Sequence, residues 1–130
     1  MSSRPLLAPN TDKPIINKAD MSGGTVTGPA TIIQMLPGIS YSFVWTGTPT
    51  GTFAIQVSND YAQNNDGTIR YAGTWNTLPT SSFQGTYPAP AGSAGNGFLD
   101  VFGTNAYAVR VVYTGSGAGN LTVVACSKVL

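Results

Sequence analysis

The side chains of this chain that could take part in chemistry are few and lie far apart. The sequence contains five aspartates, a single cysteine, and neither histidine nor glutamate. This composition excludes a serine–histidine triad, a cysteine–histidine nucleophile, a zinc site built from Cys and His, and an intramolecular disulfide. Acid–base catalysis needs a titratable group with a tuned pKa, and the aspartates stand alone, mostly in turn-forming sequence. We therefore predict that the protein is not an enzyme, with no catalytic residue, cofactor or metal site.

The polar loop at 59–73 is the stretch that most resembles a ligand site. Asp60 and Asp66 could supply oxygen ligands to calcium, but two carboxylates make a poor cage for this ion. Both lie in sequence typical of turns, where Asp and Asn side chains bond nearby backbone amides, and we favour that interpretation. Aromatic residues of the loops could alternatively stack against sugars, as in carbohydrate-binding β-sandwiches; they are Tyr61, Tyr71, Trp75 and Tyr87.

Charged residues make up only 8 % of the sequence, against about 25 % in a typical soluble domain, and the net charge is +1. This balance gives no electrostatic reason to expect binding to nucleic acid or to membranes. No apolar run approaches the roughly 18 residues of a membrane helix, and the N-terminus lacks the apolar core of a signal peptide. We expect a protein made in a cytoplasm, with a small-residue polar surface suited to coverage by other subunits.

The stretch from Tyr41 to Asp60 gives the clearest secondary-structure signal. Large apolar residues alternate with small polar ones on both sides of the sequence TGTPTG, which is typical of half-buried β-strands joined by a turn. Part of this stretch, WTGTPTGTFAI at 45–55, aligns with YTGSGAGNLTV at 113–123 when the sequence is shifted by 68 residues. We predict two related β-hairpins. Since a lone hairpin is not stable, they indicate an all-β fold, an antiparallel β-sandwich with jelly-roll-like organisation.

Shorter strands are predicted at 30–35, 68–72, 75–78 and 98–102, with an irregular loop at 81–97 and no helix. Val112 and Val124 make the second face of the C-terminal hairpin partly apolar. We interpret that face as covered by a loop, with a subunit contact as the alternative. Arg110 shares this face, and we expect it to pair with Asp100 on an adjacent strand.

Residues 1–28 differ from the rest of the chain, so we divide it into an extended N-terminal arm, 1–28, and a β-sandwich domain, 29–130. Prolines and glycines interrupt any long periodic run in the arm. A disordered tail is the plain interpretation. Leu6, Leu7, Ile15 and Ile16 favour an arm that orders on a neighbouring subunit, because a solvating tail lacks such apolar anchors. Deletion of 1–28 would then leave the domain folded but weaken its attachment.

The strand and turn sequences taken together carry a resemblance. A strand leads into TGTPTGTF and IQVSND, followed by a polar loop, the pattern W-x-x-L, and finally AVRVVYTGSG. This order resembles small structural proteins encoded among the virion genes of tailed bacteriophages, and the similarity covers about residues 30–128. The members it is most similar to are capsid decoration, or cement, proteins with β-sandwich or jelly-roll folds.

The resemblance implies a virion structural protein at the capsid surface, assembled in the host cytoplasm. It would bind the outer surface of the major capsid protein lattice and stabilise the head, as a homo-oligomer (dimer or trimer) with no nucleic-acid or membrane partner. The alternative is a carbohydrate- or receptor-binding module, or a structural subunit, of the tail or baseplate. The predicted partner-binding residues are apolar side chains of the arm, the long loop and the second hairpin: Leu6, Leu7, Ile15, Ile16, Phe83, Tyr87, Val112 and Val124.

Overall fold

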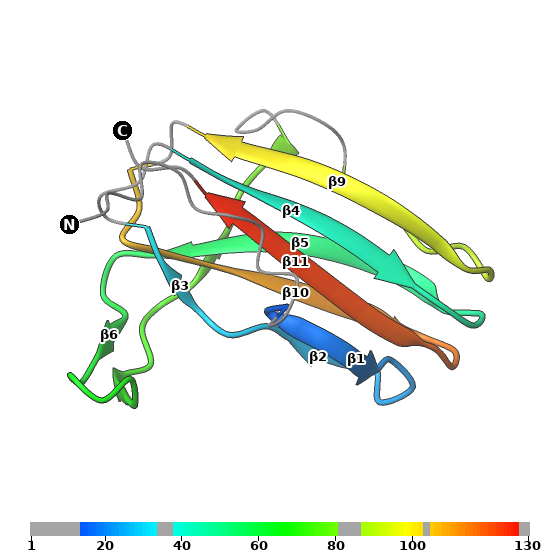
Figure 1. Cartoon of the computed structure of the whole chain (residues 1–130), viewed down its shortest axis with the longest axis horizontal. Coiled ribbons are helices and arrows are strands. Elements are labelled where there is room, and N and C mark those ends of the chain that lie inside the picture. The colour runs from blue at the N-terminus through cyan, green and yellow to red at the C-terminus, as the bar shows by residue number, and fades with distance from the viewer. Residues whose placement is uncertain (1–13, 34–37, 81–86, 103–104, 128–130) are drawn as a thin grey trace, which may run out of the picture.

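The computed structural model describes residues 14–33, 38–80, 87–102 and 105–127, which form two β-sheets packed face to face (Figure 1). The first sheet contains, in spatial order, β1 (Ile16–Asp20), β11 (Asn120–Ser127), β4 (Gly38–Trp45) and β9 (Gly95–Phe102). The second contains β2 (Thr25–Thr27), β10 (Ala108–Ser116), β5 (Thr50–Ser58) and β8 (Asn76–Thr77), with β3 (Thr31–Ile32) also on β10. A separate hairpin of β6 (Ala62–Gln63) and β7 (Ile69–Tyr71) protrudes from the sandwich (Figure 1).

The strand pairing confirms the predicted all-β, antiparallel sandwich. β1 pairs with β11 and β4 with β9 in the first sheet, while β2 pairs with β10 and β5 with β8 in the second. The first half of the chain therefore runs antiparallel to the second half, like one long hairpin folded over on itself. This is the strand order of an eight-stranded jelly roll. The described residues contain no helix that could span a bilayer.

The two predicted hairpins are wrong, because the strands of each lie in different sheets. β4 pairs with β11 and β9, whereas β5 pairs with β10 and β8, so the turn between β4 and β5 crosses from one sheet to the other. The turn between β10 and β11 crosses in the same way. Alternation predicts which side chains are buried in each strand, but it does not say whether two buried faces lie side by side or opposite each other. Here they lie opposite, with the rings of Phe43 and Phe53 4.8 Å apart.

The 68-residue repeat appears in the register of the two central ladders. Ile55 pairs with Val111 in the second sheet, and the residues 68 positions away from them, Val123 and Phe43, pair in the first. The same correspondence holds for each pair from Ala108–Ser58 to Tyr113–Phe53. The β4–β5 unit and the β10–β11 unit, which we call the two arches, are therefore related by an approximate two-fold axis, and each pairs with the other.

Repeated glycines mark the place where the two arches meet. A β-carbon on any of four of them would collide with a backbone oxygen of the opposite arch, which is a steric demand for glycine. These contacts occur in two pairs related by the two-fold axis. In one pair Gly47 lies against Ala118 and Gly115 against Thr50. In the other Gly51 lies against Thr114 and Gly119 against Thr46. Of the four, only Gly47 has a positive φ, 82°. The fifth glycine of the two sequences, Gly117, has a positive φ of 89° and also lies against the carbonyl oxygen of Thr48 on the other arch. Close backbone approach therefore requires glycine at all five positions, and turn conformation favours it at Gly47 and Gly117.

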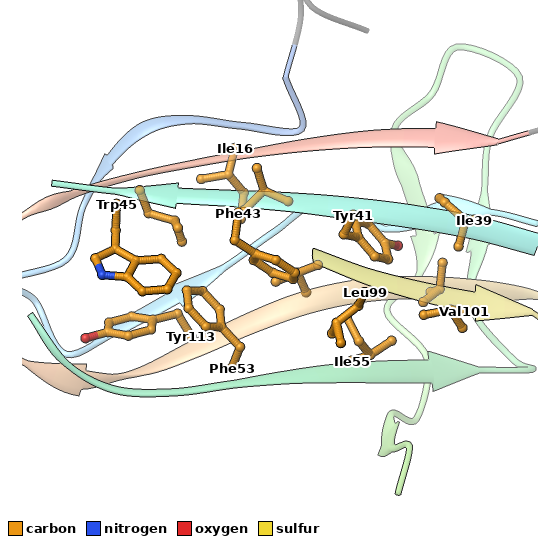
Figure 2. Packing of buried hydrophobic residues seen from close by; sticks show 14 of the residues in the cluster. Ile16, Ile39, Tyr41, Phe43, Trp45, Phe53, Ile55, Leu99, Val101 and Tyr113 are labelled. Atoms are coloured by element: carbon orange, nitrogen blue, oxygen red, sulfur yellow. The ribbon is translucent and has the colours of Figure 1, made fainter. Parts of the chain in front are cut away.

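The core lies between the sheets and is built from the inward-facing side chains of the arches and of β9 (Figure 2). Phe53 contacts three other rings, with centroids 4.8 Å from Phe43, 5.7 Å from Trp45 and 5.1 Å from Tyr113. Ring pairs at these distances add to the stabilisation from apolar burial. The hydroxyls of Tyr41 and Tyr113 are buried and have no hydrogen-bond partner among the described residues.

Part of the predicted arm belongs to the sandwich. No strand was expected in residues 1–28 beyond a short run at Ile15 and Ile16, yet β1 and β2 lie there and pair with β11 and β10. Ile16 is 5 % exposed and Met21 fully buried, so this segment completes the core rather than leaving it. Short edge strands with a bulge and glycines give little periodic signal, which explains why the sequence pattern missed them. Residues 1–13, with Leu6 and Leu7, lie outside the described residues.

Candidate functional site

Two aspartates of the described chain serve local turns. The carboxylate of Asp20 accepts hydrogen bonds from the backbone N–H and the hydroxyl of Ser22, at 2.9 and 2.7 Å. Asp66 accepts from the hydroxyl and the N–H of Thr68, at 2.6 and 3.0 Å. These bonds lower the pKa of both carboxyl groups, since each stabilises the ionised form. Within the described part of the chain, no group of three or more acidic or cysteine side chains is placed to hold a metal ion.

Asp60 is held by a denser set of bonds at the base of the β6–β7 hairpin. One oxygen, Oδ1, accepts from the N–H of Thr74 at 2.6 Å and from the hydroxyl of Ser58 at 2.8 Å. The same hydroxyl accepts from the N–H of Tyr61 at 3.1 Å. The bond from Thr74, followed by that from Ser58, lowers the pKa of the Asp60 carboxyl. The side chain is therefore a carboxylate with one oxygen fixed and the other directed away from these bonds.

The predicted partner-binding residues do not gather in one place. Ile16 is buried, and Ile15 packs against the core. Tyr87 also packs there, and its hydroxyl accepts from the N–H of Ile55 at 3.0 Å and donates to the carbonyl of Leu78 at 2.7 Å. It thereby fastens the segment before β9 to β5 and β8. Leu6, Leu7 and Phe83 lie outside the described residues.

Val112 and Val124 lie on the outer faces of opposite sheets, both half-buried. Val112, on β10, sits between Thr27 and Ala54 in register. Val124, on β11, lies opposite Ser42 of β4. Each is flanked along its strand by residues that point into the core, so the alternation correctly predicted an outward direction for both.

An exposed apolar surface lies on the outer face of the first sheet. Phe98, on the edge strand β9, is 59 % exposed, and Val44 of β4 is 51 % exposed. In register, Ser42 lies between Phe98 and Val124, and Val44 lies between Asn96 and Thr122. We call this set the Phe98 face; it consists of Ser42, Val44, Asn96, Phe98, Thr122 and Val124. None of these six residues is charged, while Asp100 follows Phe98 on the same face of β9. Exposed apolar groups that lie together often mark contact surfaces.

Trp75 is occupied within the molecule rather than open for a ligand. The guanidinium of Arg110 lies 4.2 Å from the centre of its ring, and Tyr61 contacts it with ring centres 5.6 Å apart. Arg110 also donates from Nε to the side-chain oxygen of Gln56 at 2.9 Å. The predicted pairing of Arg110 with Asp100 is wrong, because β10 and β9 lie in different sheets.

Two hollows meet beside Asp60. One, of about 300 Å³, is lined by Val57, Ser58, Asn59, Asp60, Thr74, Asn76 and Ala106. The other, of about 680 Å³, is lined by Asp60, Arg70, Tyr71, Ala72, Gly73 and Thr74. Asp60 and Thr74 line both, so the two hollows adjoin, and we call them together the Asp60 groove. Tyr71 is 59 % exposed there, and the guanidinium of Arg70 lies 5.3 Å from its ring centre.

Comparison with known proteins gives no family. No protein-family model and no curated protein matches the sequence. Among solved structures, the SPBc2 prophage-derived protein YomS is similar with 11 % identity and a TM-score of 0.37, over 87 % of this chain and 96 % of that one. The N-terminal cellulose-binding domain of Cellulomonas fimi β-1,4-glucanase C is similar with 11 % identity and a TM-score of 0.40, over 84 % of this chain and 72 % of that one. Likenesses of this size assign no function to the chain.

Sequence reasoning missed the Phe98 face and the Asp60 groove for different reasons. Phe98 was placed correctly in a strand, but a single aromatic in a run of apolar residues does not reveal which face it takes. Its neighbours Leu99 and Val101, both fully buried, fix the direction in the structure. Tyr71 was included among the loop aromatics. Its nearness to Asp60 depends on the β6–β7 hairpin folding back, for which the only signal was the turn at Asp66.

Proposed function

We propose that this protein is a structural protein of a tailed-phage virion, a decoration (cement) protein that binds the outer surface of the major capsid protein lattice. The observation that carries the proposal is the Phe98 face, an uncharged surface with Phe98 and Val44 more than half exposed. The low charge of the chain and its resemblance to decoration proteins support the same role. The jelly-roll order is compatible with it, although one fold serves many functions.

Docking through the Phe98 face would stabilise a capsid because apolar surface is buried between the two proteins, without any catalysed reaction. A specific protein contact of standard size buries on the order of 800 Å² on each partner, about the area of one face of a small sheet. Phe98 also lies on β9, which has no neighbour on its outer edge among the described strands, and such an edge can pair with a partner strand. We further propose that the protein acts as a dimer or trimer, since repeated contacts on a symmetric shell add avidity without stronger single contacts.

The arm remains part of the proposal in a shortened form. Because β1 and β2 belong to the sandwich, an arm that reaches a neighbouring subunit is restricted to the residues before Ile16. Leu6 and Leu7 are then its apolar anchors. Ile16 and Tyr87 have structural partners within the domain, so the proposed contact shifts from them to Phe98, Val44 and Val124.

The docking proposal predicts that Phe98→Ser combined with Val44→Thr prevents decoration while the domain stays folded. Both side chains are exposed, so their truncation removes contact area without opening the core. The measurement is co-sedimentation of the purified protein with phage heads assembled without it. We expect binding to weaken by about tenfold or more, the loss that follows from burying two fewer apolar groups.

Ile69→Ser is the matched control, because Ile69 is an equally exposed apolar residue, at 63 %, on the β6–β7 hairpin. This variant is expected to decorate heads as the unchanged protein does. Equal binding of the Phe98/Val44 variant and the unchanged protein would show that this face is not the docking surface.

A tail or baseplate role is the main alternative, either as a structural subunit or as a carbohydrate- or receptor-binding module. The exposed Tyr71 beside Asp60 is the specific observation that favours a binding module. Immunogold labelling of intact virions separates the two locations, since label on the head supports decoration and label confined to the tail contradicts it.

A further inference from the structure

The Asp60 groove lies on the β6–β7 hairpin and the adjoining end of the second sheet, whereas the Phe98 face is the outer surface of the first sheet. The two surfaces share no residue. Any ligand of the groove could therefore bind while the Phe98 face is covered. Its combined hollows fall in the size range of small-molecule sites, roughly 300–1,000 Å³.

The polar groups of the groove are fixed before any ligand arrives. Thr74 and Ser58 hold Oδ1 of Asp60, and Gly73, with φ 82°, has no room for a side chain because a β-carbon would lie 2.7 Å from the hydroxyl of Ser58. The Thr74 side chain also hydrogen-bonds the carboxylate and helps to lower the pKa of Asp60. A rigid acceptor of this kind loses little entropy on binding a hydroxyl donor.

Further polar groups line the floor on both sides of Asp60. The side-chain oxygen of Asn59 accepts from the N–H of Tyr107 at 3.0 Å, which orients its NH₂ group as a remaining donor. Asn76 lies next to it and is exposed, with no side-chain hydrogen bond to the described residues. Arg70 supplies a guanidinium at the other end. The groove thus offers one acceptor flanked by donors, with the charges of Asp60 and Arg70 balanced.

The aromatic part of the groove is the ring of Tyr71. Tyr71 is exposed over more than half of its surface, and Arg70 lies against it. A flat aromatic surface suits the C–H face of a pyranose ring, while adjacent carboxylate, guanidinium and amide groups suit its hydroxyls. Peptides with large apolar side chains find no deep pocket here, and nucleic acid finds no excess of positive charge.

We propose that the Asp60 groove binds a neutral oligosaccharide, with one sugar ring on Tyr71 and the next residues of the glycan along Asp60, Thr74 and Asn76. An oligosaccharide rather than a single sugar is proposed, because Tyr71 lines one hollow and Asn76 the other, and the two hollows adjoin at Asp60 and Thr74. On a virion, such a site would hold the particle against a glycan-bearing surface, and each copy would add to the avidity. The binding itself does not depend on docking to a capsid.

The test uses the full-length protein on an array of neutral oligosaccharides that includes cello-, malto-, manno- and chito-oligomers, followed by calorimetric titration with the best ligand. We expect at least one neutral oligomer to bind with a Kd of about 1 mM or tighter. Tyr71→Ala is expected to weaken that binding by about tenfold or more, because it removes the stacking surface but no core contact. Asn76→Ala is expected to weaken it less, through one lost donor.

Two controls separate the groove from other effects. Ile69→Ser changes an exposed apolar residue of the same strand that does not line the groove, and Phe98→Ser changes the opposite sheet; both are expected to bind as the unchanged protein does. Thermal melting of each variant shows that it is folded. Binding of Tyr71→Ala at unchanged affinity, binding to acidic glycans only, or no binding to any neutral oligomer at 1 mM (the weak limit of about −4 kcal/mol) would each overturn the proposal, whether or not the protein decorates heads.

Discussion

At the scale of single residues, the positions between the arches are the ones where the structure most strictly requires glycine. Their positions repeat with the 68-residue shift, and each approaches a backbone oxygen on the other arch. The sequence pattern placed these glycines in turns between strands. The steric requirement for glycine could not be predicted from the sequence. Turns usually require glycine because it adopts a positive φ, but Gly51, Gly115 and Gly119 do not have a positive φ.

Gly119→Ala is expected to lower the free energy of unfolding by about 1–3 kcal/mol, the usual cost of forcing extra atoms into a closely packed site. Its β-carbon would meet the carbonyl oxygen of Thr46, which belongs to a backbone that cannot move alone. Urea denaturation measures the change. Gly23→Ala is the control, since nothing lies within 4 Å of its β-carbon position, and we expect a change within about 0.5 kcal/mol. Equal effects of the two substitutions would refute the steric explanation.

The buried hydroxyl of Tyr41 makes the stability of the domain depend on pH. Burial raises the pKa of its hydroxyl above the usual value near 10, because the phenolate would lose its solvation. The unfolded state therefore releases this proton first as the pH rises, and stability is retained below about pH 10 and lost above it.

Tyr41→Phe is expected to weaken this loss of stability above about pH 10 and to raise stability at neutral pH by about 1 kcal/mol, since the buried hydroxyl has no partner among the described residues. Thermal melting from neutral to alkaline pH measures both effects. A Phe variant that is clearly less stable at neutral pH would mean that the hydroxyl makes a favourable contact after all.

At the scale of elements, alternation identified most of the long strands but not their partners. The stretches at 41–60 and 107–124 gave strands β4, β5, β10 and β11 nearly where the structure has them. Hairpin and arch share the same alternation, so only the contact across the core, such as Phe43 against Phe53, distinguishes them. Short strands such as β1 and β2 form because a neighbouring strand edge is available, which is a property of the fold and not of their own sequence.

Truncations test where the domain begins. Deletion of residues 1–13 is expected to leave the melting temperature nearly unchanged, because every described strand remains. Deletion of 1–28 removes β1 and β2 together with the buried Ile16 and Met21, so we expect loss of folding or a melting temperature lower by about 10 °C or more. Circular dichroism follows both. A stable 29–130 fragment would restore the domain boundary expected from the sequence.

At the scale of the whole molecule, the sandwich separates two exposed surfaces that sequence reasoning could not locate. The fold class followed from alternation, low charge and glycine-rich turns. The residues assigned to partner binding were chosen because they were apolar, and two of these, Ile16 and Tyr87, lie in the core or pack against it. Apolar character alone does not distinguish a buried residue from an exposed one, and only the structure shows that Phe98 and Tyr71 are exposed.

The pairing of β1 with β11 and of β2 with β10 has a consequence for synthesis on the ribosome. Among the described strands, β1 and β2 have no partner until β11 and β10 follow, and one edge of β4 and one edge of β5 wait for the same two strands. The sandwich therefore closes only after translation reaches the C-terminal arch, and until then its strand edges are open to other chains. Pairings so distant in sequence also close slowly. A stalled ribosome would therefore yield a fragment with unpaired strand edges rather than a smaller domain.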